Sequence, residues 1–207
     1  MRYVPARSGA LVGGDVYDVM CTPFGVRLLV GDVMGKGLSA VETAMDVLGS
    51  FRELAGHEPW LPVLARRMDA ALARREGAED FVTALLVTFA EDGGGAELVC
   101  CGHPPPLLVR RGRATFVDAL PPVPPLGLLD LQDGWCAASD VPLAPGDRLL
   151  FYTDGVTEAR DADGSSIRSR NGWRACTTAI PHAFSTRSST ISRAIPKAVS
   201  RTMSRCC

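Results

Sequence analysis

The sequence predicts an α+β fold with antiparallel sheets. Three observations support this class: a strand-like apolar run, then two consecutive stretches with helical spacing, then further strand-like runs. A regular alternation of strands with helices would instead favour a doubly wound parallel sheet. The 207 residues suffice for one domain with a sizeable core.

The predicted elements follow one another along the chain. Phe24–Val33 forms a buried strand, and helical spacing follows over Leu38–Ala55 and from Leu61 to about Glu76. One broad face of the first helix carries Leu38, Val41, Met45, Leu48, Phe51 and Leu54, and the second repeats the pattern through Leu64, Met68, Ala71 and Leu72. The later strands are Phe81–Phe89, Ala96–Cys101, Leu107–Arg110 and Arg148–Thr153, with a hairpin turn at Glu91–Gly94.

Composition excludes several classes of protein. The formal net charge of −1 argues against a generally basic nucleic-acid binder. No apolar run reaches the roughly 18 residues that span a bilayer, and the N-terminus lacks the apolar core of a signal peptide. The seven cysteines form no C-x-x-C pair, which favours a reducing cytoplasm. We interpret them as small buried hydrophobes rather than as zinc ligands or redox groups.

The charges are divided unevenly along the chain. All 23 acidic residues and 14 of the 22 basic ones lie in residues 1–164, so that this segment has a net charge of −9. Residues 165–207 carry 8 basic residues and no acid, with 14 Ser and Thr among 43 residues. A solvated tail that binds nucleic acid or a membrane is one interpretation, but no Arg cluster, aromatic interleaving or amphipathic face supports it.

Three segments place an aspartate in a glycine-rich turn beside a strand. They are Gly13–Asp18, Gly31–Gly37 and Thr153–Gly155. Converging carboxylates repel one another unless cations or protons neutralise them, and ligands that are all oxygen suit Mg²⁺ or Mn²⁺. Asp-Gly is also a common turn dipeptide, so any single segment can be a plain turn. A phosphate-binding P-loop around Lys36 is excluded because Val30 and Gly37 replace the required glycine and hydroxyl residue.

The order of these turns with other short segments resembles one protein family. The matching segments are Val12–Asp18, Gly31–Gly37, Phe81–Ala84, Gly102–Pro106, Pro125–Leu128 and Tyr152–Ala159. They look like the stage II sporulation protein E-like branch of the PPM (type 2C) metal-dependent serine/threonine protein phosphatases, in the style of actinobacterial members. The resemblance implies a two-sheet antiparallel β-sandwich flanked by helices, in α/β/β/α layers, with a dinuclear Mg²⁺ or Mn²⁺ site.

The resemblance also implies roles for individual residues. Asp32 matches the carboxylate that bridges both metals, the Val33 carbonyl matches the backbone ligand beside it, and Asp15 and Asp154 match further metal ligands. Met34 stands where many relatives have a histidine that acts as general acid, so the leaving group would take its proton from water or elsewhere. We expect His103 to serve packing and hydrogen bonding rather than to act directly. Thr83 is either a buried strand hydroxyl, which we favour, or a donor near the site.

Compared with the family, the chain looks incomplete at both ends. The first strand is mostly absent, and no Asp follows Asp163, although the family pattern ends on an Asp-Asp strand that supplies another ligand. We therefore expect a phosphatase domain at 1–164 and a poorly ordered basic tail at 165–207. Our hypothesis is that the tail is frame-shifted translation, because a neighbouring reading frame permits helical spacing and an Asp-Asp pair there. The nucleotide sequence around codon 165 tests this hypothesis.

The expected function is hydrolysis of phosphoserine or phosphothreonine on a regulatory protein, such as an anti-sigma-factor antagonist. The resemblance implies attack by a metal-activated water, with Asp15, Asp32 and Asp154 holding the metals and with impaired activity in this chain. No nucleic acid or membrane partner is expected. Two alternatives stay open: an inactive pseudophosphatase that binds a regulatory partner, and a degraded gene product that scarcely folds.

Overall fold

The computed structural model of the protein describes residues 14–35, 37–74, 81–91, 93–117, 123–131 and 136–153. Its contacts divide the chain into two compact units. One unit contains Leu11–Pro104 and Asp118–Ala144, and the other contains Met1–Ala10, Pro105–Val117 and Pro145–Cys207. Each unit holds one antiparallel sheet. The boundary predicted between residues 164 and 165 lies outside the described residues.

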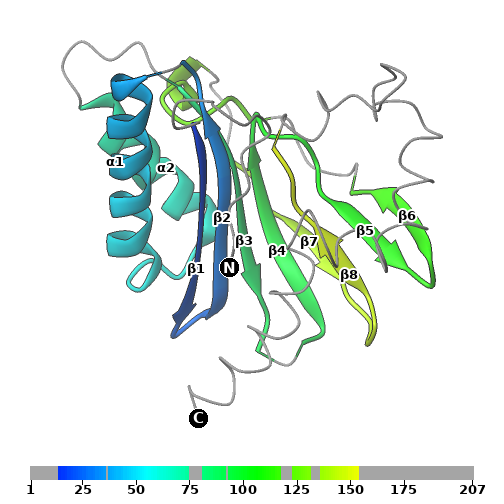
Figure 1. Ribbon diagram of the computed structural model, residues 1–207. Coiled ribbons are helices and arrows are strands. Elements are labelled where there is room, and N and C mark those ends of the chain that lie inside the picture. The colour runs from blue at the N-terminus through cyan, green and yellow to red at the C-terminus, as the bar shows by residue number, and fades with distance from the viewer. Residues whose placement is uncertain are drawn as a thin grey trace, which may run out of the picture. The chain divides into compact units, whose positions relative to one another are not determined.

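The larger sheet has five strands in the order β1-β2-β3-β4-β7. These strands are β1 (Asp15–Thr22), β2 (Gly25–Val33), β3 (Val82–Phe89), β4 (Gly95–Cys101) and β7 (Ser139–Pro142). Helix α1 (Leu38–Ala55) contacts β1 and β2, and α2 (Leu61–Ala73) contacts β3 and β4. Both helices thus cover the same face of this sheet (Figure 1). Within the described part of the chain, no helix is long and apolar enough to cross a membrane.

The hydrophobic core of this unit lies between the helices and the sheet. It contains Val16, Leu29, Val33, Val47, Phe51, Leu64, Met68, Leu86 and Val99, all buried. The alternate residues of β2 and β3, including Leu28, Val30, Leu85 and Val87, are buried as well. Burial on both faces explains why these two strands are continuous apolar runs rather than alternating ones.

The smaller sheet has three strands in the order β6-β5-β8. These are β5 (Leu107–Arg110), β6 (Arg113–Phe116) and β8 (Arg148–Leu150). An ion pair of 2.6 Å joins Arg110, at the end of β5, to Asp147, immediately before β8. Two antiparallel sheets and two adjacent helices confirm the predicted α+β class.

Most predicted elements are present, with small changes at their ends. The first predicted helix and the strand Leu107–Arg110 have the predicted bounds, whereas the last predicted strand stops at Leu150 instead of Thr153. Strand β1 and the four-residue strands β6 and β7 were missed. Each of these three lies at the edge of its sheet and contains at least one charged residue, and β6 and β7 have only four residues each, so that their apolar signal is weak.

The buried face of α1 differs from the predicted apolar face. Leu38 and Met45 are 75% and 67% exposed, while the buried residues are Ala40, Thr43, Val47, Phe51 and Ala55. Small side chains at three of these buried positions let the helix backbone approach the sheet closely, which larger ones would prevent. The predicted face was therefore wrong at Leu38 and Met45, whereas Phe51 is buried and Val41, Leu48 and Leu54 are partly buried as predicted.

A buried arginine connects the helices to the sheet. Arg27 of β2 is 0% exposed, and its guanidinium donates to the carbonyls of Ala55 (2.9 Å), Glu58 and Pro59 (2.7 Å). Ala55 is the last residue of α1, and the other two lie in the link to α2. The cation thus satisfies carbonyls at the negative end of the α1 dipole. The Phe24 ring, 4.9 Å from the guanidinium carbon, adds a cation–π contact.

Arg27→Leu should lower the free energy of unfolding by about 2–4 kcal/mol, because it leaves several carbonyls without their donor. Urea denaturation of the purified chain measures this loss. Arg52→Leu is the matched control, since Arg52 makes an ion pair with Asp18 but its side chain is 61% exposed. Its expected loss is about 1 kcal/mol or less. Equal losses in the two variants would contradict the anchoring role of Arg27.

The register of β4 and β7 predicts a pH dependence. Glu97 lies directly opposite Asp140, and burial, followed by this neighbouring carboxylate, raises the pKa of Glu97 above its ordinary 4.5 despite the opposing charge of Arg27. At pH values between the pKa of Glu97 in the unfolded state and its higher pKa in the folded state, only the folded state keeps the proton. The free energy of unfolding therefore falls as pH rises through this range. Glu97→Gln should raise the melting temperature at neutral pH more than below about pH 4.

Thermal melts of both proteins across pH measure this difference. Glu42→Gln, which changes an exposed carboxylate on α1, is the control and should give no such trend. A constant difference between Glu97→Gln and the unsubstituted protein at every pH would contradict the prediction.

Candidate metal centre

Two of the predicted ligands face each other across neighbouring strands. Asp15 is the first residue of β1 and pairs in register with Asp32, near the end of β2. Residues paired directly in an antiparallel ladder carry their side chains on the same face, about 5 Å apart. Val16, Leu29 and Val33 face the helices, so Asp15 and Asp32 lie on the opposite face of the sheet.

A missing side chain at Gly14 leaves room beside this pair. A Cβ atom there would lie 2.5 Å from the Val33 carbonyl oxygen and 3.0 Å from Oδ1 of Asp32. The Val33 N–H donates to the Gly14 carbonyl at 3.0 Å, which extends the β1–β2 ladder past Asp15. The two ligand oxygens predicted from Asp32 and Val33 therefore lie together, and only glycine fits next to them.

The next strand supports Asp32 from its other side. Thr83 of β3 pairs in register with Asp32, and its hydroxyl donates to the Asp32 carbonyl at 3.4 Å. Nδ1 of His103 lies 3.1 Å from the same hydroxyl, and His103 is 5% exposed. A hydroxyl has only one proton to donate. Because Thr83 donates it to the Asp32 carbonyl, Nδ1 of His103 must be the donor to the Thr83 oxygen. Thr83 is thus a half-buried strand hydroxyl that bonds the main chain of the neighbouring strand, close to the favoured prediction, and His103 makes the expected hydrogen bond.

Other predicted residues contribute less to this arrangement. Met34 is 52% exposed, and its backbone N–H donates to Phe81. Asp154 lies outside the described residues, so its role as a ligand stays a prediction. Among the residues that the structure describes, no group of three or more His, Cys, Asp or Glu side chains is arranged to hold a metal ion.

The atoms that do come together fit a hard divalent cation. The Asp15 and Asp32 carboxylates and the Val33 carbonyl supply only oxygen donors, as Mg²⁺ and Mn²⁺ prefer. Two carboxylates directly opposite each other on adjacent strands are destabilising in themselves, and a bound cation relieves their repulsion. This half of the predicted site is therefore consistent with the metal that the sequence indicates.

Asp69 was missed by the sequence analysis. It is 6% exposed on α2, and its Oδ1 accepts from the backbone N–H groups of Gly127 (2.6 Å) and Leu129 (3.2 Å). Leu126 exchanges two backbone hydrogen bonds of 2.9 Å with Val82, at the start of β3. The conspicuous Pro125–Leu128 segment is thus held between α2 and β3. The sequence feature that could have identified Asp69 is its position as an aspartate on the apolar face of a predicted helix.

Gly14→Ala should destabilise the protein by about 1–3 kcal/mol, because the new methyl group collides with the Val33 carbonyl. Gly49→Ala is the matched control, since Gly49 lies exposed on α1, where an added Cβ atom would meet nothing within 4 Å. In that helix the substitution should stabilise by about 0.5–1 kcal/mol. Denaturant melts compare the two variants, and a neutral Gly14→Ala would contradict the close approach.

Comparisons with known proteins identify the family of this chain and agree with its fold. The family model of stage II sporulation protein E (SpoIIE) matches residues 22–204, a range that includes Asp32, Val33 and Asp154 and begins after Asp15. Phosphoserine phosphatase RsbU of Bacillus subtilis (strain 168) is 26% identical over 167 residues, which are 78% of this chain and 47% of RsbU. The chain therefore spans about half the length of this curated relative.

Solved structures give the same result for the fold. The RsbU and RsbW domains of Rv1364c from Mycobacterium tuberculosis match with a TM-score of 0.65 and 25% identity, over 84% of this chain and 46% of that one. The PP2C phosphatase domain of SpoIIE from Bacillus subtilis gives a TM-score of 0.63 and 18% identity, over 84% and 48%. The SiaA-PP2C domain of Pseudomonas aeruginosa gives a TM-score of 0.65 and 18% identity, over 93% of this chain and 74% of that one. The fold of this chain is like that of these PP2C domains. Because the family model matches residues 22–204, which is most of its length, the chain belongs to the stage II sporulation protein E (SpoIIE) family.

Proposed function

We propose that this chain is the catalytic domain of a metal-dependent phosphatase that hydrolyses phosphoserine or phosphothreonine on a protein. The observation that carries the proposal is the pairing of Asp15 with Asp32 beside the Val33 carbonyl, in a chain of the SpoIIE family. The relative RsbU is a phosphoserine phosphatase, which supports the same chemistry here.

Asp15, Asp32, the Val33 carbonyl and Asp154 would hold Mg²⁺ or Mn²⁺. When bound, a metal pair supplies a water of lowered pKa and polarises the phosphoryl group. The residues of the chain position these ligands: Thr83, in contact with His103, fixes the main chain at Asp32. Met34 has no proton to give, so the leaving oxygen takes its proton from solvent or from another group.

The substrate that we propose is a regulatory phosphoprotein, such as an anti-sigma-factor antagonist. The family resemblance of the sequence supports this class, as does similarity to the RsbU and RsbW domains of one chain. We place the reaction in the cytoplasm, which the cysteine pattern favours.

We also propose that activity is weakened in this chain. The family pattern supplies a further ligand from a terminal Asp-Asp pair, and no Asp follows Asp163 here. A site with one carboxylate fewer should bind one metal less tightly. Turnover should then reach half of its maximum at a higher Mn²⁺ concentration than in relatives with the complete pattern. Half-saturation at the same Mn²⁺ concentration as in such relatives would contradict this part of the proposal.

Asp32→Asn tests the metal centre by two readouts. Mn²⁺ should raise the melting temperature of the unsubstituted chain, because a ligand that binds only the folded state stabilises it. The variant should lose this shift, and it should lose activity on an aryl phosphate and a phosphoserine peptide by about 100-fold or more, since even residues that only support a ligand cost about 10- to 100-fold.

Asp18→Asn is the matched control. Asp18 lies on the same strand but pairs with Leu29 and binds Arg52 of α1, so both readouts should stay unchanged. If Mn²⁺ leaves the melting temperature and the turnover of the unsubstituted chain unchanged, the catalytic proposal is wrong and a partner-binding pseudophosphatase replaces it. If Asp32→Asn keeps both responses, the metal is bound elsewhere.

A further inference from the structure

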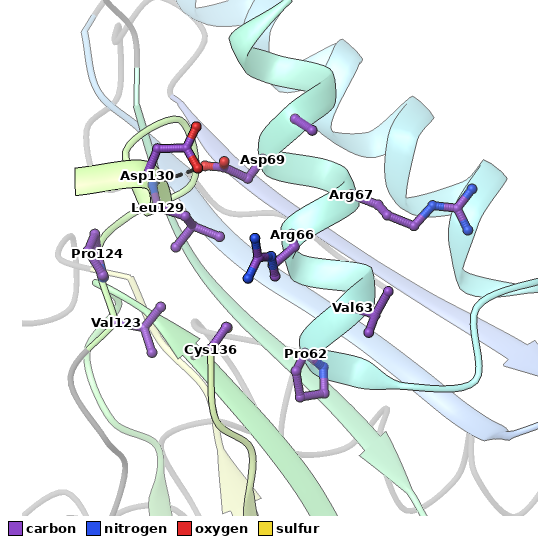
Figure 2. Close-up of a pocket in the computed structure, with 11 residues that line it drawn as sticks. Pro62, Val63, Arg66, Arg67, Asp69, Val123, Pro124, Leu129, Asp130 and Cys136 are labelled. Carbon is purple, nitrogen blue, oxygen red and sulfur yellow. Dashed lines mark hydrogen bonds between the residues drawn. The ribbon is translucent and has the colours of Figure 1, made fainter. Parts of the chain in front are cut away.

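Two polar features lie on the side of the larger sheet that the helices cover, away from Asp15 and Asp32. One is a pocket of about 430 Å³, whose lining includes Arg66 and Asp69 of α2 together with Leu129 (Figure 2). Asp69 is buried there, but its Oδ1 already accepts two backbone hydrogen bonds. Within the described part of the chain, no buried side-chain nitrogen or oxygen atom of this lining lacks a hydrogen-bond partner. The second feature, a row of polar residues across the strands, differs in this respect.

The polar row crosses β2, β3 and β4. Arg27 pairs in register with Thr88, and Thr88 pairs in register with Glu97. The Arg27 guanidinium reaches the end of α1, so this side chain points towards the helices. Leu86 and Val99, two positions away on β3 and β4, belong to the core under the helices, which places the rest of the row on the same face. Thr88 therefore lies between a cation and a carboxylate, with directly paired side chains about 5 Å apart.

Two atoms of this row are buried without a hydrogen-bond partner among the described residues. The two terminal nitrogens of Arg27 donate to carbonyls at the end of α1 and in the link to α2, but its Nε has no acceptor there. The hydroxyl oxygen of Thr88 is in the same position. Arg27 is 0% exposed and Thr88 is 9% exposed, so bulk solvent does not hydrate these atoms. A buried polar atom that stays unpaired destabilises the folded state, which makes a ligand at this place favourable.

The chemistry of the row selects the kind of ligand. The Nε–H of Arg27 and the hydroxyl of Thr88 are both donors, and the Glu97 carboxyl group beside them is an acceptor, so the ligand must accept twice and donate once. The charge of Arg27 disfavours a cation. An anion would lie beside Glu97 and Asp140, which pair in register on β4 and β7. A neutral water molecule has the required acceptors and donor, and it bridges side chains that are too far apart for a direct hydrogen bond.

We propose that Arg27, Thr88 and Glu97 form a binding site for one internal water molecule. The water accepts from Nε of Arg27 and from the hydroxyl of Thr88, and it donates to a carboxyl oxygen of Glu97. A carboxyl group keeps an acceptor oxygen whether it is ionised or protonated, so the site works in both states of Glu97. The water extends the contacts of Arg27 with the end of α1 to the neighbouring strands β3 and β4.

High-resolution crystal structures of the full chain and of two Thr88 variants test the site directly. In the unsubstituted chain we expect one water within about 2.7–3.2 Å of Nε of Arg27, the Thr88 hydroxyl and a Glu97 oxygen. Thr88→Ser keeps the hydroxyl and should keep the water, whereas Thr88→Val should lose it. A protein group bonded to Nε or to the hydroxyl in place of the water, or no water at either atom, would overturn the proposal.

The sign of the stability change in Thr88→Val tests the same site in solution. Valine has nearly the shape of threonine, so the substitution removes the hydroxyl without opening a cavity. If the hydroxyl holds the water, its loss should lower the melting temperature by about 2–4 °C relative to a control. The matched control is Thr115→Val on β6, where Thr115 is exposed, and it should change the melting temperature by about 1–2 °C at most. If the hydroxyl is simply unpaired, Thr88→Val should raise the melting temperature. Such a rise, or a shift equal to that of the control, contradicts the water site.

Discussion

The close approach of three neighbouring strands is the constraint on which the rest of this structure depends. A Cβ atom at Gly14 would lie 2.5 Å from the Val33 carbonyl, and one at Gly31 would lie 2.6 Å from the Thr83 carbonyl. Because the strands pass so closely only where these side chains are missing, the two glycines fix which residues oppose each other. Asp15, Asp32 and Thr83 form one row across β1, β2 and β3 as a consequence.

The helical layer is fixed to this sheet by buried polar contacts as well as by apolar packing. Arg27 reaches from β2 to the carbonyls at the end of α1, and Asp69 reaches from α2 to the backbone of Gly127 and Leu129. Apolar packing alone would allow a helix to slide or rotate, whereas each of these groups makes its hydrogen bonds in one position only. They therefore help to decide which face of α1 turns inwards, where Leu38 and Met45 stay exposed although they are apolar.

The sequence predicted what is local and left open what is not. The bounds of α1 follow from its periodicity, and the strands β2 and β3 follow from unbroken apolar runs. The family resemblance selected Asp15 and Asp32, and the register of β1 on β2 brings them opposite each other. The strand β1 itself was missed because Asp15 and Asp18 interrupt its pattern. The prediction of buried cysteines holds for Cys101 and Cys136, but it was wrong for Cys21, which is exposed on this edge strand. Neither the inward face of α1 nor the partners of Asp69 could be predicted, because each depends on residues far away in the chain.

Two opposed acidic pairs on the same sheet show how similar charges serve different ends. Glu97 and Asp140 lie opposite each other on β4 and β7, and the charge of Arg27 offsets part of their repulsion. The pKa of Glu97 is still raised, so that protonation of Glu97 relieves the remaining repulsion. Asp15 and Asp32 instead lie beside a third oxygen donor, the Val33 carbonyl. A metal ion requires several oxygen ligands, whereas a shared proton does not, so this arrangement favours a metal ion. If a cation relieves the repulsion between Asp15 and Asp32, its binding energy is also folding energy for β1, the edge strand that carries Asp15. Part of the high negative charge of residues 1–164 would then come from metal ligands, and the folded chain would be most stable with the cation bound.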